Sequence, residues 1–311
     1  MTIIYMIFAH KSPDQLARLI HRLNTSKSIF FVHVDKGTDD LTFNEMVEGV
    51  RELHNITFVK RNKVEWGWII FAINEVISDI VHRKIEFDYI FFLSGQDYPI
   101  KTNAYIEDFL AKNKGKQFIN YFLIPRDPSD GWANDNGGLD RIENWHIRLF
   151  KKCYRIPGRI KRNSRIKSIF WHFVLRFIPK RKFIQGYKPF GGEAWWCLTK
   201  ECTEYMNAFM IANPRFVSYF KYVDIADEIF YQSIILNSAF KDSVINDDLR
   251  CIDWSAGGSH PRIWRKGDIE ILRRSKGLIA RKFDSRVDSE VLDLIDSKLL
   301  QTGQSEAPEG T

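Results

Sequence analysis

The chain has 311 residues, 44% of them hydrophobic, which is enough for one large α/β domain or two small ones. Its net charge of +7 is local: residues 151–192 hold thirteen Lys and Arg and no acidic residue, so the remainder carries −6, which argues against a general affinity for nucleic acid. No stretch approaches the roughly 20 apolar residues of a transmembrane helix, and a strand pattern starts at Thr2 without a basic leader. We therefore expect a cytoplasmic protein.

Four cysteines are present, and their spacing gives no sign of a metal site or a redox pair. They include no Cys-x-x-Cys pair and have no His at the spacing of metal ligands. The sequence predicts reduced, partly buried thiols with no structural zinc and no disulfide. The four residues are Cys153, Cys197, Cys202 and Cys251.

The first two predicted strands end in polar residues. Residues 3–8 form a strand pattern that exits through His10, and a helical pattern follows Ser12-Pro13. Residues 29–34 form the second strand, which is followed by Asp35. A carboxylate at this position either accepts hydrogen bonds from a nucleotide's base or ribose, or caps a turn.

The next strands repeat this arrangement. Residues 56–59 form a third strand, and Trp66-Gly67 precedes an apolar helix, where a glycine lets a ligand approach the backbone closely. Residues 89–93 read as a central strand, and Ser94 and Asp97 follow it. These residues either face a ligand beyond the strand end or form an ordinary turn.

Strands that alternate with helices before residue 100 predict parallel βαβ units and a doubly wound sheet. No Gly-x-Gly-x-x-Gly follows the first strand, and no Gly-Lys-Ser/Thr loop occurs in the chain. Dinucleotide enzymes and P-loop nucleotidases are therefore disfavoured.

Residues 151–190 form a basic, aromatic and amphipathic segment. Within it, residues 155–183 are expected either to hold the protein on an anionic membrane face or to form a solvated face whose aromatics pack on the domain. The basic residues also fit a different class of protein, one without catalytic activity that binds nucleic acid or anionic surfaces through residues 151–192. Motifs elsewhere in the chain favour an enzyme.

The later chain holds further candidates. Glu193, Trp195 and Trp196 suit a sugar, whose C–H faces stack on indoles while its hydroxyls seek acceptors, although a buried aromatic strand fits equally well. Asp227 and Glu228 begin a helical pattern, where acidic residues also compensate the helix dipole. Three cations, Arg262, Arg281 and Lys282, lie near the end of the fold.

Taken together, these pieces resemble the core-2/I-branching N-acetylglucosaminyltransferases and peptide O-xylosyltransferases of glycosyltransferase family 14, and they occur in family order. The matching pieces are Val32–Lys36, Val64–Gly67, Phe92–Lys101, Gly191–Trp196, Asp227–Ser238, Leu249–Trp254 and Ala280–Asp284. The resemblance implies a single GT-A-like α/β domain with a mostly parallel central sheet flanked by helices. It also implies an inverting, metal-independent transfer from a UDP-sugar, with N-acetylglucosamine or xylose as the donor sugar.

The resemblance also implies roles for individual residues. Asp35 contacts uridine, Lys282 and Arg262 hold the diphosphate, and Glu228 is the base. The remaining expected donor contacts are His10, Trp66, Gly67, Ser94, Asp97 and Arg281. The expected acceptor contacts are Glu193, Trp195, Trp196 and Asp227, although relatives have Gly-Ser-x-Trp where this chain has Gly192-Glu193-Ala194-Trp195.

The chemistry supports these roles. A sugar hydroxyl needs a carboxylate to take its proton as it attacks, and the leaving diphosphate needs positive charge. The chain has no Asp-x-Asp pair to hold a metal, so cations are expected to serve instead and no cofactor is expected beyond the UDP-sugar co-substrate. The expected acceptor is a glycan, lipid-linked if the basic segment meets the membrane.

We expect a transferase domain over residues 1–285 and a packing helix within 286–300. Residues 301–311 are polar and are expected to be a disordered tail.

Overall fold

The computed structural model describes the chain except for residues 66, 128–135, 150–151, 157–178, 259 and 302–311. Its centre is a seven-stranded sheet in the order β12-β6-β11-β4-β1-β2-β3. All neighbouring pairs are parallel except the two that β11 makes. The mostly parallel α/β architecture is therefore confirmed. The strands are β1 (Ile3–Ala9), β2 (Ser28–Val34), β3 (Ile56–Phe58), β4 (Tyr89–Ser94), β6 (Gln117–Ile119), β11 (Trp196–Thr199) and β12 (Val244–Ile245).

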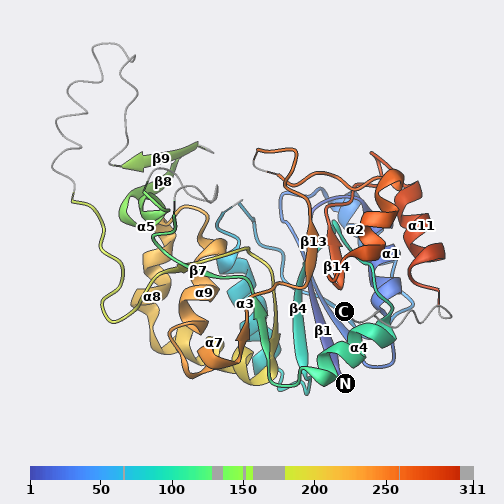
Figure 1. The fold of residues 1–311 in the computed structure, drawn as a ribbon, viewed down its shortest axis with the longest axis horizontal. Helices are drawn as coiled ribbons and strands as arrows, with labels where there is room; N and C mark the ends of the chain where they lie inside the picture. Colours follow the sequence, from blue (N-terminus) through green and yellow to red (C-terminus); the bar gives the residue numbers. More distant parts are fainter. Residues whose placement is uncertain (66, 128–135, 150–151, 157–178, 259, 302–311) are drawn as a thin grey trace, which may run out of the picture.

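Helices cover both faces of this sheet (Figure 1). One core lies between the sheet and α1 (Pro13–Leu23), α2 (Asp40–Glu48), α4 (Asn103–Lys112), α10 (Ile269–Arg274) and α11 (Glu290–Lys298). The other lies under α3 (Ile70–His82), α7 (Lys200–Ala212), α8 (Pro214–Tyr219) and α9 (Phe230–Ile235). Side chains alternate along β1, so that Tyr5 enters the first core and Met6 the second. With both faces covered, the carboxyl ends of the parallel strands are left to carry polar groups.

Smaller elements surround the ends of these strands. A three-stranded sheet joins β13 (Arg250–Ile252), β14 (Ile279–Arg281) and β5 (Asp97–Pro99), and β7 (Phe122–Leu123) pairs with β10 (Phe190–Gly191). Helix α5 (Leu139–Glu143) precedes a hairpin of β8 (Trp145–Leu149) and β9 (Lys152–Ile156). Single turns complete the fold: η2 (Phe220–Tyr222), η3 (Ala226–Glu228), η4 (Ala239–Ser243) and η5 (Lys266–Asp268).

The C-terminal part of the described chain packs on the first core. Helix α11 lies within the stretch 286–300 and buries Val291, Leu292 and Ile295. Apart from Gln301, the predicted tail lies outside the described residues. No described helix is long and apolar enough to cross a bilayer.

Gly192, just after β10, joins two parts of the fold by close backbone approach. A Cβ at this position would lie 1.9 Å from the carbonyl oxygen of Asn120, which follows β6. The Gly192 N–H also donates to the carbonyl of Glu228 at 2.9 Å. Only glycine therefore fits between the central sheet and the turn η3.

Replacing Gly192 by alanine should destabilise the protein by roughly 1–3 kcal/mol or more, because backbone atoms must move to admit the methyl group. Gly267→Ala is the matched control, since a Cβ there meets nothing within 4 Å. Urea unfolding of both variants measures the difference. Equal stability of the two variants would contradict the close packing at Gly192.

Candidate active site

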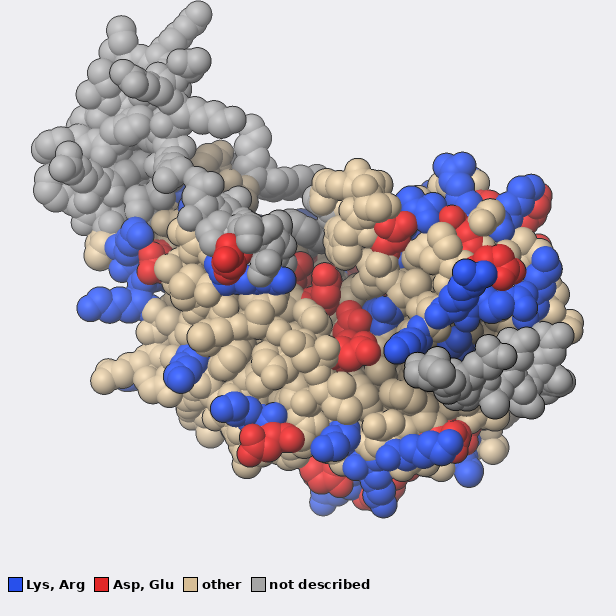
Figure 2. All heavy atoms as spheres, viewed as in Figure 1, with Lys and Arg blue, Asp and Glu red and all other residues tan. Residues whose placement is uncertain are grey.

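A cleft lies at the carboxyl ends of β1, β2 and β4. Its volume of about 380 Å³ falls in the range of about 300–1,000 Å³ typical of small-molecule sites. In Figure 2 acidic and basic side chains lie close together in the central hollow of the molecule. The polar side chains that line the cleft are His10, Lys11, His33, Asp35, Ser94, Gln96, Glu193, Asp227, Glu228, His260 and Arg281, with Trp195 and Trp254.

The strand ends place His10, Asp35 and Ser94 in the cleft wall, as the strand pattern predicts. Asp35 Oδ1 accepts the N–H of Gly37 at 2.7 Å and that of Val64 at 3.4 Å. The turn-capping alternative for Asp35 is therefore correct, and the same side chain also borders the cleft. Gly67 lines the cleft as well, whereas Trp66 lies outside the described residues.

Arg281 enters the cleft as half of a buried ion pair. Strand β14 pairs with β5 so that Arg281 lies opposite Asp97, and Arg281 Nη1 is 2.9 Å from Asp97 Oδ1. Asp97 is fully buried, does not line the cleft and accepts the backbone N–H of Ser94 at 2.8 Å. The donor contact predicted for Asp97 is therefore wrong, because its carboxylate is used to fix Arg281.

Other cations adjoin Arg281. Lys11 lines the cleft and is held 2.7 Å from Asp284, which follows Lys282 by two residues. Burial lowers the pKa of the Lys282 ammonium, and the positive charges of Arg281 and Lys11 lower it further. A bound anion would relieve this repulsion.

Arg262, the second cation expected at a diphosphate, forms ion pairs with two carboxylates outside the cleft lining. Its Nε is 2.6 Å from Asp253, its Nη1 is 3.0 Å from Asp268, and it does not line the cleft. The diphosphate contact predicted for Arg262 is not present in this arrangement. The described Lys and Arg side chains that line the cleft are Arg281 and Lys11.

Glu228 sits in a turn that is held from two sides. Ile225 adopts a left-handed conformation with φ of 49°, and the next N–H, of Ala226, donates to the carbonyl of Gly67 at 2.7 Å. Gly67 itself has φ of 80°. On the other side the Gly192 N–H donates to the Glu228 carbonyl. The side chain of Glu228 then accepts Arg141 Nη1 at 2.8 Å.

Two further carboxylates lie beside Glu228. Burial raises the pKa of Glu193 to about 7, and the negative charge of Glu228 adds to the effect. The same two causes, in the same order, raise the pKa of Asp227 to about 7. Asp227 Oδ1 is buried without a hydrogen-bond partner among the described residues. Near neutral pH these two groups are therefore partly protonated, which limits the negative charge around Glu228.

The two adjacent tryptophans face different environments. Trp195 lines the cleft, lies 5.0 Å from the ring of Phe92, and has the guanidinium carbon of Arg281 4.4 Å from its ring centroid. Trp196 is fully buried on β11 and does not line the cleft. The acceptor contact predicted for Trp196 is therefore wrong, because alternation along the chain turns it into the core.

Sequence reasoning did not assign roles to several residues at the site. Arg141 of α5 pairs with Glu228, and nothing in its local sequence indicates this. Arg250 is held by the carbonyl of Asp248 at 2.7 Å and lies 5.0 Å from the Trp195 ring. Arg250 lies in the motif Leu249–Trp254, which is one of those that carry the family resemblance. That motif could have identified Arg250 as a residue of the site.

The described end of the basic segment packs on the domain. Arg181 is buried, donates to the carbonyls of Tyr219 and Tyr222, and lies 3.8 Å from the Tyr219 ring. Phe183 contacts the ring of Phe216. Membrane contact is therefore wrong for Arg181, while residues 157–178 of the segment lie outside the described residues.

The comparisons with known proteins agree with one another. The model of the family described as Core-2/I-Branching enzyme matches residues 3–135 and 138–275. Xylosyltransferase 2 of Rattus norvegicus is 26% identical over 325 residues, covering 96% of this chain and 33% of that protein. Xylosyltransferase of Ciona intestinalis is 22% identical over 321 residues, covering 96% of this chain and 34% of that protein. The chain thus spans about a third of the length of these curated relatives.

Among solved structures, mouse xyloside xylosyltransferase 1 in its apo form aligns over 90% of this chain and 96% of that chain. The identity is 10% and the TM-score is 0.35, a likeness too weak to carry an argument. The family match spans most of the chain that forms the cleft. The chain belongs to the Core-2/I-Branching enzyme family.

Proposed function

We propose that this protein is an inverting glycosyltransferase that moves N-acetylglucosamine or xylose from a UDP-sugar to a hydroxyl of a glycan acceptor. The observation that carries the proposal is a single cleft in which Glu228 adjoins a group of cations that includes Arg281 and Lys11. Transfer needs both, a base for the hydroxyl and positive charge for the leaving diphosphate. Both relatives described above are named as xylosyltransferases, which supports sugar transfer.

The donor is assigned to the strand ends. Asp35 would accept hydrogen bonds from uridine, and His10 and Ser94 border the same wall. Arg281 and Lys11, which line the cleft, would hold the diphosphate and take up the charge that develops as the bond to C1 breaks. Lys282 follows Arg281 without lining the cleft itself, and we propose that it reaches the diphosphate when the donor binds. In this proposal these cations stabilise the negative charge of the diphosphate in place of a metal ion. No cofactor is then required beyond the UDP-sugar.

The acceptor is assigned to the carboxylates. Glu228, oriented by Arg141, would take the proton of the attacking hydroxyl. Trp195 offers a face for a sugar ring, and Glu193 and Asp227 offer hydrogen bonds to its other hydroxyls. Attack opposite the diphosphate inverts C1, so an α-linked UDP-sugar yields a β-linked product, which suits the synthesis of a surface polysaccharide or glycoconjugate.

The place of the reaction completes the proposal. We place the enzyme in the cytoplasm, peripheral to the membrane, where the basic segment of residues 155–183, without the buried Arg181, would meet anionic lipid and a lipid-linked glycan would be presented. This membrane contact stays a prediction. A nucleic-acid partner is not expected, since the cleft and the family both indicate a sugar.

Glu228→Gln should lower turnover by roughly two to four orders of magnitude, because the amide cannot take a proton, while UDP binding changes little. The measurement is UDP release from a panel that includes UDP-N-acetylglucosamine and UDP-xylose, with glycan acceptors. Glu45→Gln, on the exposed face of α2, is the matched control and should keep full turnover. A Glu228→Gln enzyme with unimpaired turnover would remove this residue from the mechanism.

Lys282→Ala should weaken UDP binding by roughly 10- to 100-fold, the effect of losing one charged hydrogen bond to phosphate. Calorimetric titration with UDP measures this, and Lys276→Ala, an exposed lysine, is the control. Neither EDTA nor added Mn²⁺ should change the affinity of the wild type. An affinity that rises steeply with Mn²⁺ would show that a metal, rather than these cations, holds the diphosphate.

A further inference from the structure

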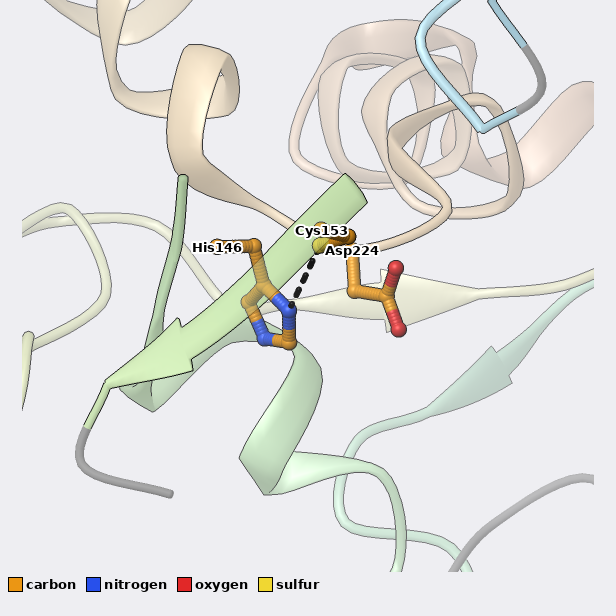
Figure 3. Close-up of side chains that lie close together, drawn as sticks. All are labelled: His146, Cys153 and Asp224. Atoms are coloured by element: carbon orange, nitrogen blue, oxygen red, sulfur yellow. Dashed lines mark hydrogen bonds between the residues drawn. The ribbon is translucent and has the colours of Figure 1, made fainter. Parts of the chain in front are cut away.

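Three side chains of metal-binding type meet beside the turn that carries Glu228. His146 of β8, Cys153 of β9 and Asp224 each offer one ligand atom, and these atoms lie within 4.8 Å of one another. Figure 3 shows the three side chains close together, with a dashed line between the Cys153 sulfur and the His146 ring. None of them lines the cleft, and the transfer reaction proposed above does not use them.

The hairpin register explains how the group forms. Arg148 lies opposite Cys153 and His146 lies opposite Arg155, so His146 and Cys153 are diagonal neighbours on one face of the β8–β9 pair. Asp224 comes from the segment between η2 and η3, and its N–H donates to the carbonyl of Arg141 at 3.1 Å. The ligands therefore come from two distant parts of the chain, which is why their spacing in the sequence gave no signal.

The imidazole of His146 is oriented as a metal ligand. His146 is buried, and its Nε2 lies 3.1 Å from the carbonyl oxygen of Asp140, which can only accept a hydrogen bond. Nε2 therefore carries the proton and Nδ1 keeps a lone pair, 4.0 Å from Cys153 Sγ. A nitrogen and a sulfur bound tetrahedrally to zinc lie about 3.5 Å apart, so small side-chain rotations complete the geometry.

The donor set selects the kind of ion. Imidazole, thiolate and carboxylate together suit Zn²⁺, whereas Mg²⁺ and Mn²⁺ prefer oxygen ligands alone. One thiolate and one carboxylate also balance the charge of a divalent ion. A nucleophilic Cys-His-Asp arrangement would place the carboxylate on the second imidazole nitrogen, but in this protein a backbone carbonyl holds that nitrogen.

We propose that His146 Nδ1, Cys153 Sγ and the Asp224 carboxylate bind one zinc ion that ties the β8–β9 hairpin to the segment leading to Glu228. Arg141 links the two sites, since its carbonyl accepts the Asp224 N–H and its guanidinium donates to Glu228. Zinc would thereby fix the partner of the base. Three protein ligands leave a fourth position for water, and the exposure of Cys153 gives solvent access to it.

The test uses the full chain, reduced and stripped of metal, titrated with Co²⁺ as a spectroscopic probe and then with Zn²⁺ in competition with a chelating dye. The wild type should bind one ion per chain and show the charge-transfer absorption of a sulfur–cobalt bond. Cys153→Ser should lose that absorption and lower zinc affinity by at least roughly 100-fold, more than the 10- to 100-fold cost of losing an outer-shell partner. Asp224→Asn should weaken binding while keeping the absorption.

Cys251→Ser is the matched control, because Cys251 is a half-buried free thiol in another part of the fold and should leave the absorption intact. Circular dichroism of the metal-free variants shows whether each is folded. A wild type without the absorption, or an absorption that survives Cys153→Ser or disappears in Cys251→Ser, would overturn the proposal. The readout is metal binding itself, so it is independent of whether the chain transfers a UDP-sugar.

Discussion

The catalytic assignment depends on the turn at residues 225–228, which two backbone hydrogen bonds hold between separate loops. The Ala226 N–H donates to Gly67 at 2.7 Å, and the Gly192 N–H donates to Glu228 at 2.9 Å. The turn requires Ile225 to adopt a left-handed backbone conformation. For a β-branched residue this conformation is unfavourable by about 1–3 kcal/mol of free energy. Both bonds act on the backbone next to the Glu228 carboxylate, the proposed base. Displacing a reacting group by 1 Å can cost about 10²-fold in rate, so the two glycines that hold this turn are expected to influence the rate.

A second interaction, the ion pair of Arg281 and Asp97, holds a positive charge in the cleft wall. Losing the Asp97 carboxylate would leave an uncompensated buried charge, at a cost of about 3–5 kcal/mol. The positive charge that Asp97 stabilises also lowers the pKa of Glu193, opposing the larger effect of burial. The side chains proposed to hold the diphosphate and the acceptor therefore influence each other's charge. This explains why Asp97 belongs to a functional piece of sequence although it does not line the cleft.

The parts of the fold that the sequence predicts are those set by local periodicity. Apolar runs identified β1, β2 and β4, and the residues just beyond them, His10, Asp35 and Ser94, reach the cleft because parallel strands end at one edge. The motifs that resemble the family identified Glu228 and Arg281 as further candidates for the site. The buried aromatic strand offered as one alternative for Trp195 and Trp196 corresponds to β11, but its antiparallel direction was not predicted, because four residues carry no pattern that fixes direction.

The remaining features come from contacts between distant segments. Period-two alternation separates Trp195 from Trp196, but nothing in the sequence says which of the two faces the cleft. The pairing of Arg141 with Glu228 and the meeting of His146, Cys153 and Asp224 depend on where the hairpin docks. Arg181 is buried because backbone carbonyls and aromatic rings accept its guanidinium, an arrangement that charge patterning cannot reveal.

The proposed reaction is a single displacement at C1, with one carboxylate as base and fixed cations on the leaving group. The anomeric configuration of the first product, followed by proton NMR during turnover of an α-linked UDP-sugar, tests it most directly. A single displacement should give a β-linked product from the earliest time point. An α-linked product would contradict it, because retention requires another mechanism and a different role for Glu228.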